Sequence, residues 1–328
     1  MDDITHNAPL HQIHRTRGMG ETMTHAQNTQ NKLQLTALGD GDGLLVTPRD
    51  GSAEFTDLYE AGLDELLADA GHLLIRGFEP SVDDFNALVR QYSSRTTLDP
   101  ARVFHGDAAQ KVDSGTDAIG LHLENGATPY APELLWFHCV KAASSGSQTT
   151  VCDGFRVWDA LSERARDLFA AQPISYERTV PAALWRKLAA FLAGDGRGPD
   201  EVTVADLYDQ ANPGAKVEFT ERPDGSLFYH YQVFAAHPTK WSTRTAWANS
   251  LLGPSYNYEA PDIRFADGSR IPDEVTAEYV EVTERVTEEI AWQDGDIVLI
   301  DNSRVMHGRR AITDTHRTIL NSQSYARN

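Results

Sequence analysis

Two short segments far apart in the chain carry the residue types from which a metal site can be built. His122 and Glu124 lie two positions apart, and His307 lies in the run Asp301-Asn302-Ser303-Arg304-Val305-Met306-His307-Gly308-Arg309. Arg317 follows that histidine ten positions later. Two imidazoles and one carboxylate are the ligand set of a non-haem iron site with open coordination positions. A guanidinium is a planar fork that binds carboxylates, so the set also predicts an anchor for a dicarboxylate co-substrate.

The spacing of a histidine and an acid two positions apart is weak evidence, because this composition produces such pairs by chance. Both His122-Leu123-Glu124 and His105-Gly106-Asp107 match it. The second pair has glycine at its centre in a polar stretch, which favours a turn. The first has apolar neighbours at 121 and 123, so a strand there would turn both 122 and 124 toward one cavity. We therefore expect the first pair to bind the metal.

The hydrophobic pattern predicts both helices and short strands. Residues 55–70 have helical spacing and stop at Gly71, and 83–92 is a second helix, while 93–118 is polar and irregular. Val275 to Ile290 has the spacing of an amphipathic helix. Further helices are expected near 162–171, 184–194 and 203–211. Strands are expected at 72–78, 119–124, 133–140, 149–152, 216–219, 227–234 and 297–300.

This order of elements favours an α+β fold. Short strands in two blocks are typical of a double-stranded β-helix, or jelly roll, with flanking helices. A doubly wound sheet fits less well, because strict strand–helix alternation and a glycine-rich phosphate loop are missing. We predict a single domain over 34–328, with a helical insertion at about 172–215 that covers the site. Residues 1–33 are polar and predict a flexible tail, whose four histidines are better explained by solvation than by metal binding.

Composition restricts the partners. The net charge of −19 disfavours binding to nucleic acid or to anionic membranes. Two cysteines, Cys139 and Cys152, cannot form a disulfide framework and are expected to be buried free thiols in a reducing cytosol. No apolar stretch approaches the length of a membrane span, and the N-terminus lacks the apolar core of a secretory signal. These features predict a cytoplasmic protein that acts on a small molecule.

With these motifs in order, the chain resembles the taurine dioxygenase/clavaminate synthase-like superfamily of Fe(II)- and 2-oxoglutarate-dependent oxygenases. The resemblance covers about residues 34–326. The long run from Asp301 to Arg309 is its most specific part. The other matching segments are His72-Leu73-Leu74-Ile75-Arg76-Gly77-Phe78, Leu121-His122-Leu123-Glu124, Gly146-Ser147-Gln148-Thr149 and Trp247-Ala248-Asn249-Ser250.

The resemblance implies a role for each matching residue. His122, Glu124 and His307 would ligate Fe(II), while Thr149 and Arg317 would bind the distal carboxylate of 2-oxoglutarate. Many relatives carry a second arginine four positions after the first; here that position is Asn321, which is expected to face the same cavity and donate a hydrogen bond. Asn125, Asn249 and Arg309 are candidates for contact with the substrate.

The implied reaction couples oxidative decarboxylation of 2-oxoglutarate by dioxygen to hydroxylation of an unactivated C–H bond, or to desaturation or cyclisation. The retained Glu124 argues against halogenation, because related halogenases lose this carboxylate. The branch with glutamate at this position suggests a small polar metabolite, such as an amino acid or a derivative in specialised metabolism. Two alternatives remain: a zinc-dependent hydrolase on the same triad, and a non-catalytic jelly-roll binding protein.

Overall fold

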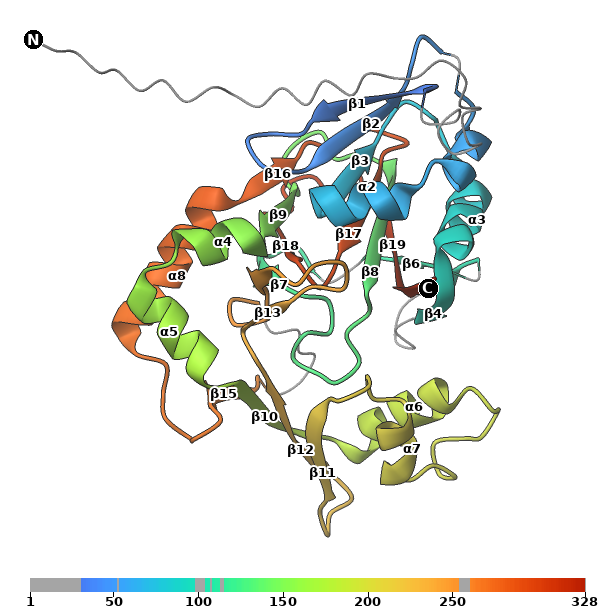
Figure 1. Cartoon of the computed structure of the whole chain (residues 1–328). Helices are drawn as coiled ribbons and strands as arrows, with labels where there is room; N and C mark the ends of the chain where they lie inside the picture. The colour runs from blue at the N-terminus through green and yellow to red at the C-terminus, as the bar shows by residue number, and fades with distance from the viewer. Residues whose placement is uncertain are drawn as a thin grey trace, which may run out of the picture.

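The computed structural model describes residues 31–51, 53–97, 104–106, 108–112, 115–253 and 260–327. Residues 1–30 of the predicted tail, and Asp107 of the alternative metal motif, lie outside the described residues. Helices and sheets are mixed along the chain, as the sequence predicted. Figure 1 shows two central sheets with helices at their sides and a further sheet below them.

The largest sheet has nine strands and supplies one wall of the site. Seven of its neighbouring pairs are antiparallel, and β2 and β3 are parallel. Its spatial order is β1 (Leu33–Ala37), β2 (Leu44–Pro48), β3 (His72–Ile75), β17 (Ile297–Asp301), β8 (Leu134–Lys141), β19 (Thr318–Ala326), β6 (Ala109–Lys111) and β5 (Phe104–His105), with β4 (Ser93–Thr97) also paired to β19.

A four-stranded sheet faces the first and supplies the opposite wall. Its order is β16 (Glu288–Ile290), β9 (Thr149–Asp153), β18 (Val305–Arg309) and β7 (Ile119–His122). Leu135, Phe137 and Cys139 alternate along β8 and pack with Val151 of β9 and Val305 of β18 in one buried cluster. Because alternate residues of a strand point to opposite faces, Leu134 and Trp136 of β8 belong to a different cluster. The two sheets thus enclose one apolar layer, at whose edge the site lies.

Helices cover the outer faces of both sheets. On the nine-stranded sheet, Leu63, Phe85 and Trp136 share a buried cluster; the helical elements there are the 3₁₀ helix η1 (Phe55–Glu60), α2 (Leu63–Ala70) and α3 (Val82–Tyr92). On the other side, α4 (Gly154–Ala160), α5 (Glu163–Ala171) and α8 (Asp273–Val286) pack in a second cluster with the hairpin β13 (Ala236–Pro238) and β14 (Thr245–Trp247).

A further four-stranded sheet, here called the outer sheet, lies at the bottom of Figure 1 beside α6 (Ala182–Ala193) and α7 (Val204–Asp209). Its order is β11 (Lys216–Glu221), β12 (Leu227–Val233), β10 (Ile174–Val180) and β15 (Asp262–Phe265). It contacts the turn that carries Glu124: Tyr229 donates its hydroxyl to the Ala127 carbonyl at 3.1 Å. Tyr130 in turn donates its hydroxyl to the Leu207 carbonyl of α7 at 3.0 Å.

Several expectations about secondary structure were wrong. The helix predicted over 55–70 is two elements, because Gly62 between them is left-handed, with φ of 66°. The segment 93–118, expected to be irregular, supplies β4, β5 and β6. Strands β4 and β6 pair with distant β19, and β5 pairs with β6. The helix expected to reach Ile290 ends at Val286, and Glu288–Ile290 pairs with β9 instead. Over the described residues, no helix is long and apolar enough to cross a membrane.

Candidate metal and co-substrate site

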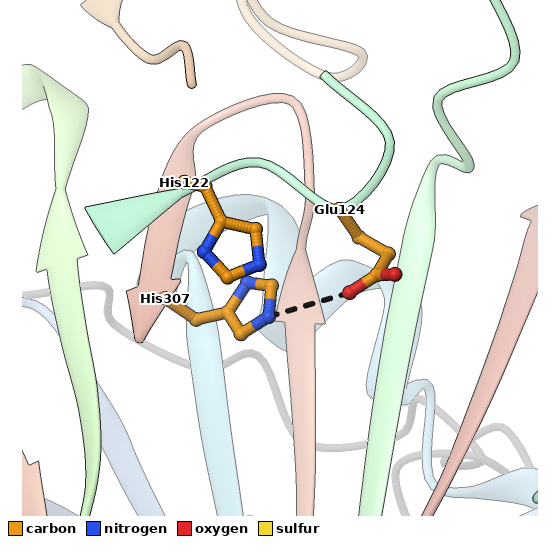
Figure 2. Close-up of side chains that lie close together, drawn as sticks. All are labelled: His122, Glu124 and His307. Carbon is orange, nitrogen blue, oxygen red and sulfur yellow. Dashed lines mark ion pairs between the residues drawn. The ribbon is translucent and has the colours of Figure 1, made fainter. Parts of the chain in front are cut away.

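The two histidines come together because their strands are neighbours. His307 of β18 lies directly opposite His122 of β7 in an antiparallel pair, and the centroids of the two rings are 4.2 Å apart. The carboxylate of Glu124 completes the group, as Figure 2 shows. One candidate ligand atom from each of the three residues lies within 4.8 Å of the other two, and all three side chains are buried. The structure thus brings the predicted triad together from two distant segments.

Gly308 explains why β7 can lie so close to β18. A Cβ atom at this position would be 2.6 Å from the Ile119 carbonyl oxygen and 2.8 Å from Thr150 Oγ1. Contacts that short are not tolerated, so any larger residue would push one neighbouring strand away. The glycine between His307 and Arg309 therefore keeps the two imidazoles in register.

The tautomer of His122 follows from its hydrogen bond. Its Nδ1 lies 2.8 Å from the carbonyl oxygen of Gly120. A carbonyl only accepts, so Nδ1 carries a proton, and in the neutral imidazole Nε2 keeps its lone pair. Such a bond to the far ring nitrogen is how metal-ligating histidines are usually oriented. His122 is thereby prepared to offer Nε2 to a metal ion.

Glu124 lies in a turn and not on a strand, which corrects the spacing argument. β7 ends at His122, and the segment after it is held by Asn302. The Glu124 amide donates to Asn302 Oδ1 at 2.8 Å, and Asn302 Nδ2 donates to the carbonyls of Glu124 at 3.1 Å and Pro132 at 2.8 Å. The side chain of Asn302 therefore holds both the amide and the carbonyl of Glu124.

Arg304 fastens the start of β18 to β9. Its Nη2 donates to Asp153 Oδ2 at 2.6 Å and its Nε to Asp153 Oδ1 at 3.1 Å, a bidentate pair that is almost fully buried. Nη2 also reaches Asp42 at 2.8 Å. Nearby, burial raises the pKa of Asp301 to about 6, although Ser303 donates two hydrogen bonds to it. The segment that leads to His307 is thus anchored by buried charged groups.

A cavity beside the triad ends in two guanidinium groups. It is lined by Val112, Ile119, His122, Glu124, Phe137, Thr149, His307, Gly308, Arg309, Arg317, Ile319 and Asn321. Burial lowers the pKa of Arg317, and the nearby Arg309 cation lowers it further. Arg317 Nη1 makes only a long contact of 3.5 Å with the Ser147 carbonyl, and its buried Nη2 has no hydrogen-bond partner among the described residues. The guanidinium groups of Arg309 and Arg317 repel each other, and a carboxylate bound between them would stabilise both charges.

Arg309 also organises the cavity rim. Its Nη2 donates to the carbonyl oxygens of Gly115 at 3.0 Å and Asp117 at 2.7 Å, which ties the segment before β7 to β18. Strand β18 lies between β7 and β9, and on the β9 side Arg309 pairs in register with Thr149. Strand β18 thus places His307 beside His122 and Arg309 beside Thr149.

The remaining predicted residues divide into two groups. Thr149 and Asn321 line the cavity, and the buried Oδ1 of Asn321 has no partner among the described residues. Asn125 and Asn249 do not occur among the described residues that line it. The side chain of Asn249 donates from Nδ2 to the Ala235 carbonyl at 3.1 Å and accepts at Oδ1 from the Leu251 amide at 3.0 Å. It therefore fixes the backbone at these two residues.

These residues fit Fe(II) and a keto-dicarboxylate. Two imidazoles and one carboxylate on one side of a metal suit ferrous iron and leave positions for other ligands. The imidazole of His122 is already oriented, and the orphaned Nη2 of Arg317 is a buried donor that lacks an acceptor among the described residues. Thr149 adds a hydroxyl to the same cavity.

The hydroxyl of Thr149 is itself oriented by Trp292, a residue that the sequence did not single out. Trp292 Nε1 donates to Thr149 Oγ1 at 3.1 Å, so the threonine proton is free to point into the cavity. We expect Trp292→Phe to raise the half-saturating concentration of 2-oxoglutarate by about 2- to 10-fold, the effect of one neutral hydrogen bond. Titration of the anaerobic Fe(II) protein measures this, and Fe(II) affinity should not change. An unaltered 2-oxoglutarate titration would remove Trp292 from this role.

Asn302 and Gln323 are two further residues that were missed. Gln323 donates from Nε2 to Glu124 Oε1 at 2.7 Å. A signal for it existed, because Gln323 lies two positions after Asn321 on the same strand and therefore shares its face. Asn302 stood within the most specific motif, but only the fold shows which backbone it holds.

Comparison with known proteins identifies a matching family model and several similar proteins. The family model "Taurine catabolism dioxygenase TauD, TfdA family" matches residues 46–323. A clavaminate synthase-like protein of Arabidopsis thaliana is 24% identical over 287 residues, covering 78% of this chain and 82% of that protein. The dapdiamide synthesis protein DdaC of Enterobacter agglomerans is 26% identical over 297 residues, covering 81% and 86%. A taurine dioxygenase from Burkholderia xenovorans shares the fold, with a TM-score of 0.59, 12% identity, and coverage of 90% of each chain.

Proposed function

The chain belongs to the TauD/TfdA family of dioxygenases, and on that premise we propose that it oxidises an unactivated C–H bond of a small polar metabolite. Enzymes of this family use Fe(II), 2-oxoglutarate and dioxygen, so the protein is an Fe(II)- and 2-oxoglutarate-dependent oxygenase. This assignment decides against the zinc hydrolase and against the non-catalytic binding protein.

The proposed iron ligands are His122, Glu124 and His307. One observation carries this choice: their ligand atoms converge within 4.8 Å in a buried place, beside a cavity with two guanidinium groups. We propose that Arg317 and Thr149 bind the distal carboxylate of 2-oxoglutarate, and that Asn321 donates a hydrogen bond within the same cavity. Of the three residues considered for the substrate, Arg309 lines the cavity and is retained.

The chain's own groups would bind and orient the metal ion and the co-substrate, and they exclude water from the cavity. Fe(II) and 2-oxoglutarate, when bound, would supply with dioxygen the oxidant that breaks a C–H bond, and the 2-oxoglutarate consumed would leave as succinate and carbon dioxide. Phe137 packs against His307, with ring centroids 5.5 Å apart, and Ile319 lines the same cavity, so apolar groups limit the access of water. The Arg317 charge is strongest as an anchor in such a dry place, because burial weakens screening.

We propose further that the two facing sheets form a double-stranded β-helix, the jelly roll expected from the sequence. The shared apolar layer between β8 and β9 supports this. We also retain one domain over 34–328, although its first strand, β1, already begins at the buried Leu33. Its insertion at about 172–215 contributes α6, α7 and part of the outer sheet. The hydrogen bond from Tyr130 to Leu207 is consistent with an insertion that covers the turn of Glu124.

The substrate is proposed to be an amino acid or a derivative in specialised metabolism. Support comes from the sequence relative DdaC, whose name places it in dapdiamide synthesis. Hydroxylation is the proposed outcome, while desaturation or cyclisation would follow from a different position of the same C–H bond. Because Glu124 is present and within reach of the histidines, halogenation is not proposed.

The class of substrate can be tested without knowing the product. Candidate amino acids are added to the anaerobic Fe(II)–2-oxoglutarate protein while its visible charge-transfer band is recorded. A compound that binds beside the metal is expected to perturb the band, and oxygen is then expected to convert 2-oxoglutarate to succinate in equal amount to oxidised substrate. Succinate formed without Fe(II), or a complete set of amino acids and derivatives that leaves the band unchanged, would contradict the proposal.

A further inference from the structure

One oxygen of the Glu124 carboxylate is already engaged by the protein. Gln323 donates from Nε2 to Glu124 Oε1 at 2.7 Å, while Oε2 lies 3.4 Å from His307 Nε2. The two oxygens therefore have different surroundings: Oε1 faces an amide of β19, and Oε2 faces the histidine. All three side chains are buried, so solvent does not exchange with these contacts freely.

Strand β19 brings this amide to the site by simple alternation. Side chains two positions apart on a strand share a face. Asn321 lines the cavity, Gln323 contacts Glu124, and Tyr325 donates its hydroxyl to Asn212 Oδ1 at 2.8 Å. Along one face of β19, successive side chains therefore contact the co-substrate cavity, then the carboxylate of Glu124, and then the insertion. The contact with Glu124 belongs to the framework of the site and not to a flexible surface side chain.

Chemistry fixes the direction of the hydrogen bond. An ionised carboxylate only accepts, so Gln323 must turn its NH₂ group toward Glu124. Its own oxygen, Oε1, then needs a donor, and Asn125 Nδ2 supplies one at 3.1 Å. Asn125 has a φ of 55°, a left-handed conformation that asparagine adopts more readily than most residues. The three side chains form a one-way relay from Asn125 through Gln323 to Glu124.

We propose that Gln323 is a positioning residue that restricts Glu124 to coordination of the iron through a single oxygen, and that Asn125 sets the orientation of Gln323. A carboxylate can bind a metal through one oxygen or through both. With Oε1 held by an amide, only Oε2 is offered. Coordination through both oxygens would occupy a position that the bidentate co-substrate and dioxygen require. This inference rests on the proposed function, because it assumes that Glu124 is a ligand.

The test is the affinity of the anaerobic, metal-free protein for Co(II), measured by calorimetry together with the ligand-field absorption of the bound ion. Gln323→Met keeps the length of the side chain and removes the donor. We expect it to weaken Co(II) binding by about 10- to 100-fold, as for other residues that orient a metal ligand. The ligand-field spectrum should change as well, because the carboxylate becomes able to bind through both oxygens.

Asn125→Asp is a second variant that changes no volume. Its carboxylate would attract the NH₂ group of Gln323, so the glutamine would present its oxygen to Glu124 and the relay would be reversed. We expect weaker Co(II) binding and the same spectral change. The added negative charge alone would strengthen binding of a cation, so a loss cannot be explained by charge. The left-handed backbone tolerates aspartate nearly as well as asparagine.

Ser322→Ala is the matched control. Ser322 is the buried neighbour of Gln323 on the opposite face of β19, and its hydroxyl has no partner among the described residues. The Ser322→Ala protein should bind Co(II) like the wild type, with an unchanged spectrum. Wild-type affinity and spectrum in both Gln323→Met and Asn125→Asp would overturn the inference. If Gln323→Met does not fold, wild-type affinity and spectrum in Asn125→Asp alone would overturn it. A wild-type protein that binds neither Co(II) nor Fe(II) would instead overturn the proposed function.

Discussion

Replacement of His307 by alanine is expected to abolish Fe(II) binding at micromolar metal. The imidazole supplies one of three protein ligands, and its loss leaves His122 and Glu124 with too few donors to hold a ferrous ion. Changes to groups that merely orient a ligand already cost about 10- to 100-fold in metal affinity, so loss of the ligand should exceed that range. Calorimetry under anaerobic conditions measures the change, and succinate formation should be lost with it.

His105→Ala is the control for that experiment. His105 belongs to the other His-x-acid pair in the sequence and lies on β5 at the edge of the nine-stranded sheet. It should bind Fe(II) as the wild type does. If His105→Ala lost the metal while His307→Ala retained it, the choice of triad would be wrong.

Replacement of Arg317 by alanine is expected to raise the 2-oxoglutarate requirement ten-fold or more. A hydrogen bond to a charged group contributes about 1.5–3 kcal/mol, and ten-fold corresponds to about 1.4 kcal/mol. The buried Nη2 of Arg317 has no partner among the described residues, so the group is ready for a carboxylate acceptor. The half-saturating concentration of 2-oxoglutarate in the anaerobic Fe(II) protein measures the effect, and metal affinity without the co-substrate should stay the same.

Arg310→Ala is a matched control for charge. Arg310 is partly exposed and pairs with Glu284 at 2.9 Å and Glu289 at 2.7 Å, away from the cavity. It should leave the 2-oxoglutarate requirement unchanged. Equal effects of Arg310→Ala and Arg317→Ala would mean that net charge, and not a specific contact, controls co-substrate binding.

The sequence predicted the members of the triad but not how they meet. The motif around His307 predicted the distal histidine, and the apolar neighbours of His122 favoured the acidic pair that the structure brings together with it. The strand argument for Glu124 was wrong, because β7 ends at His122 and the carboxylate is placed by Asn302 from a distant turn. A local pattern cannot reveal such a contact, since the two residues are 178 positions apart.

The same limit explains the other differences. β4, β5 and β6 are short; β4 and β6 are strands because β19 offers them a partner, and β5 is a strand because it pairs with β6. Ile290 continued the helical spacing of α8, yet its backbone pairs with Thr149 of β9. Gln323 had no motif, although its position on the face of β19 could have been inferred once Asn321 was placed in the cavity. Residue types predicted the chemistry, while long-range pairing determined the geometry.

The most direct test of the proposed site is an anaerobic crystal structure with Mn(II) in place of iron and with 2-oxoglutarate. The expected result is one metal ion bound by His122, Glu124 through a single oxygen, and His307, with the distal carboxylate of 2-oxoglutarate on Arg317 and Thr149. A metal ion bound elsewhere, or a co-substrate whose distal carboxylate lies away from Arg317, would contradict it.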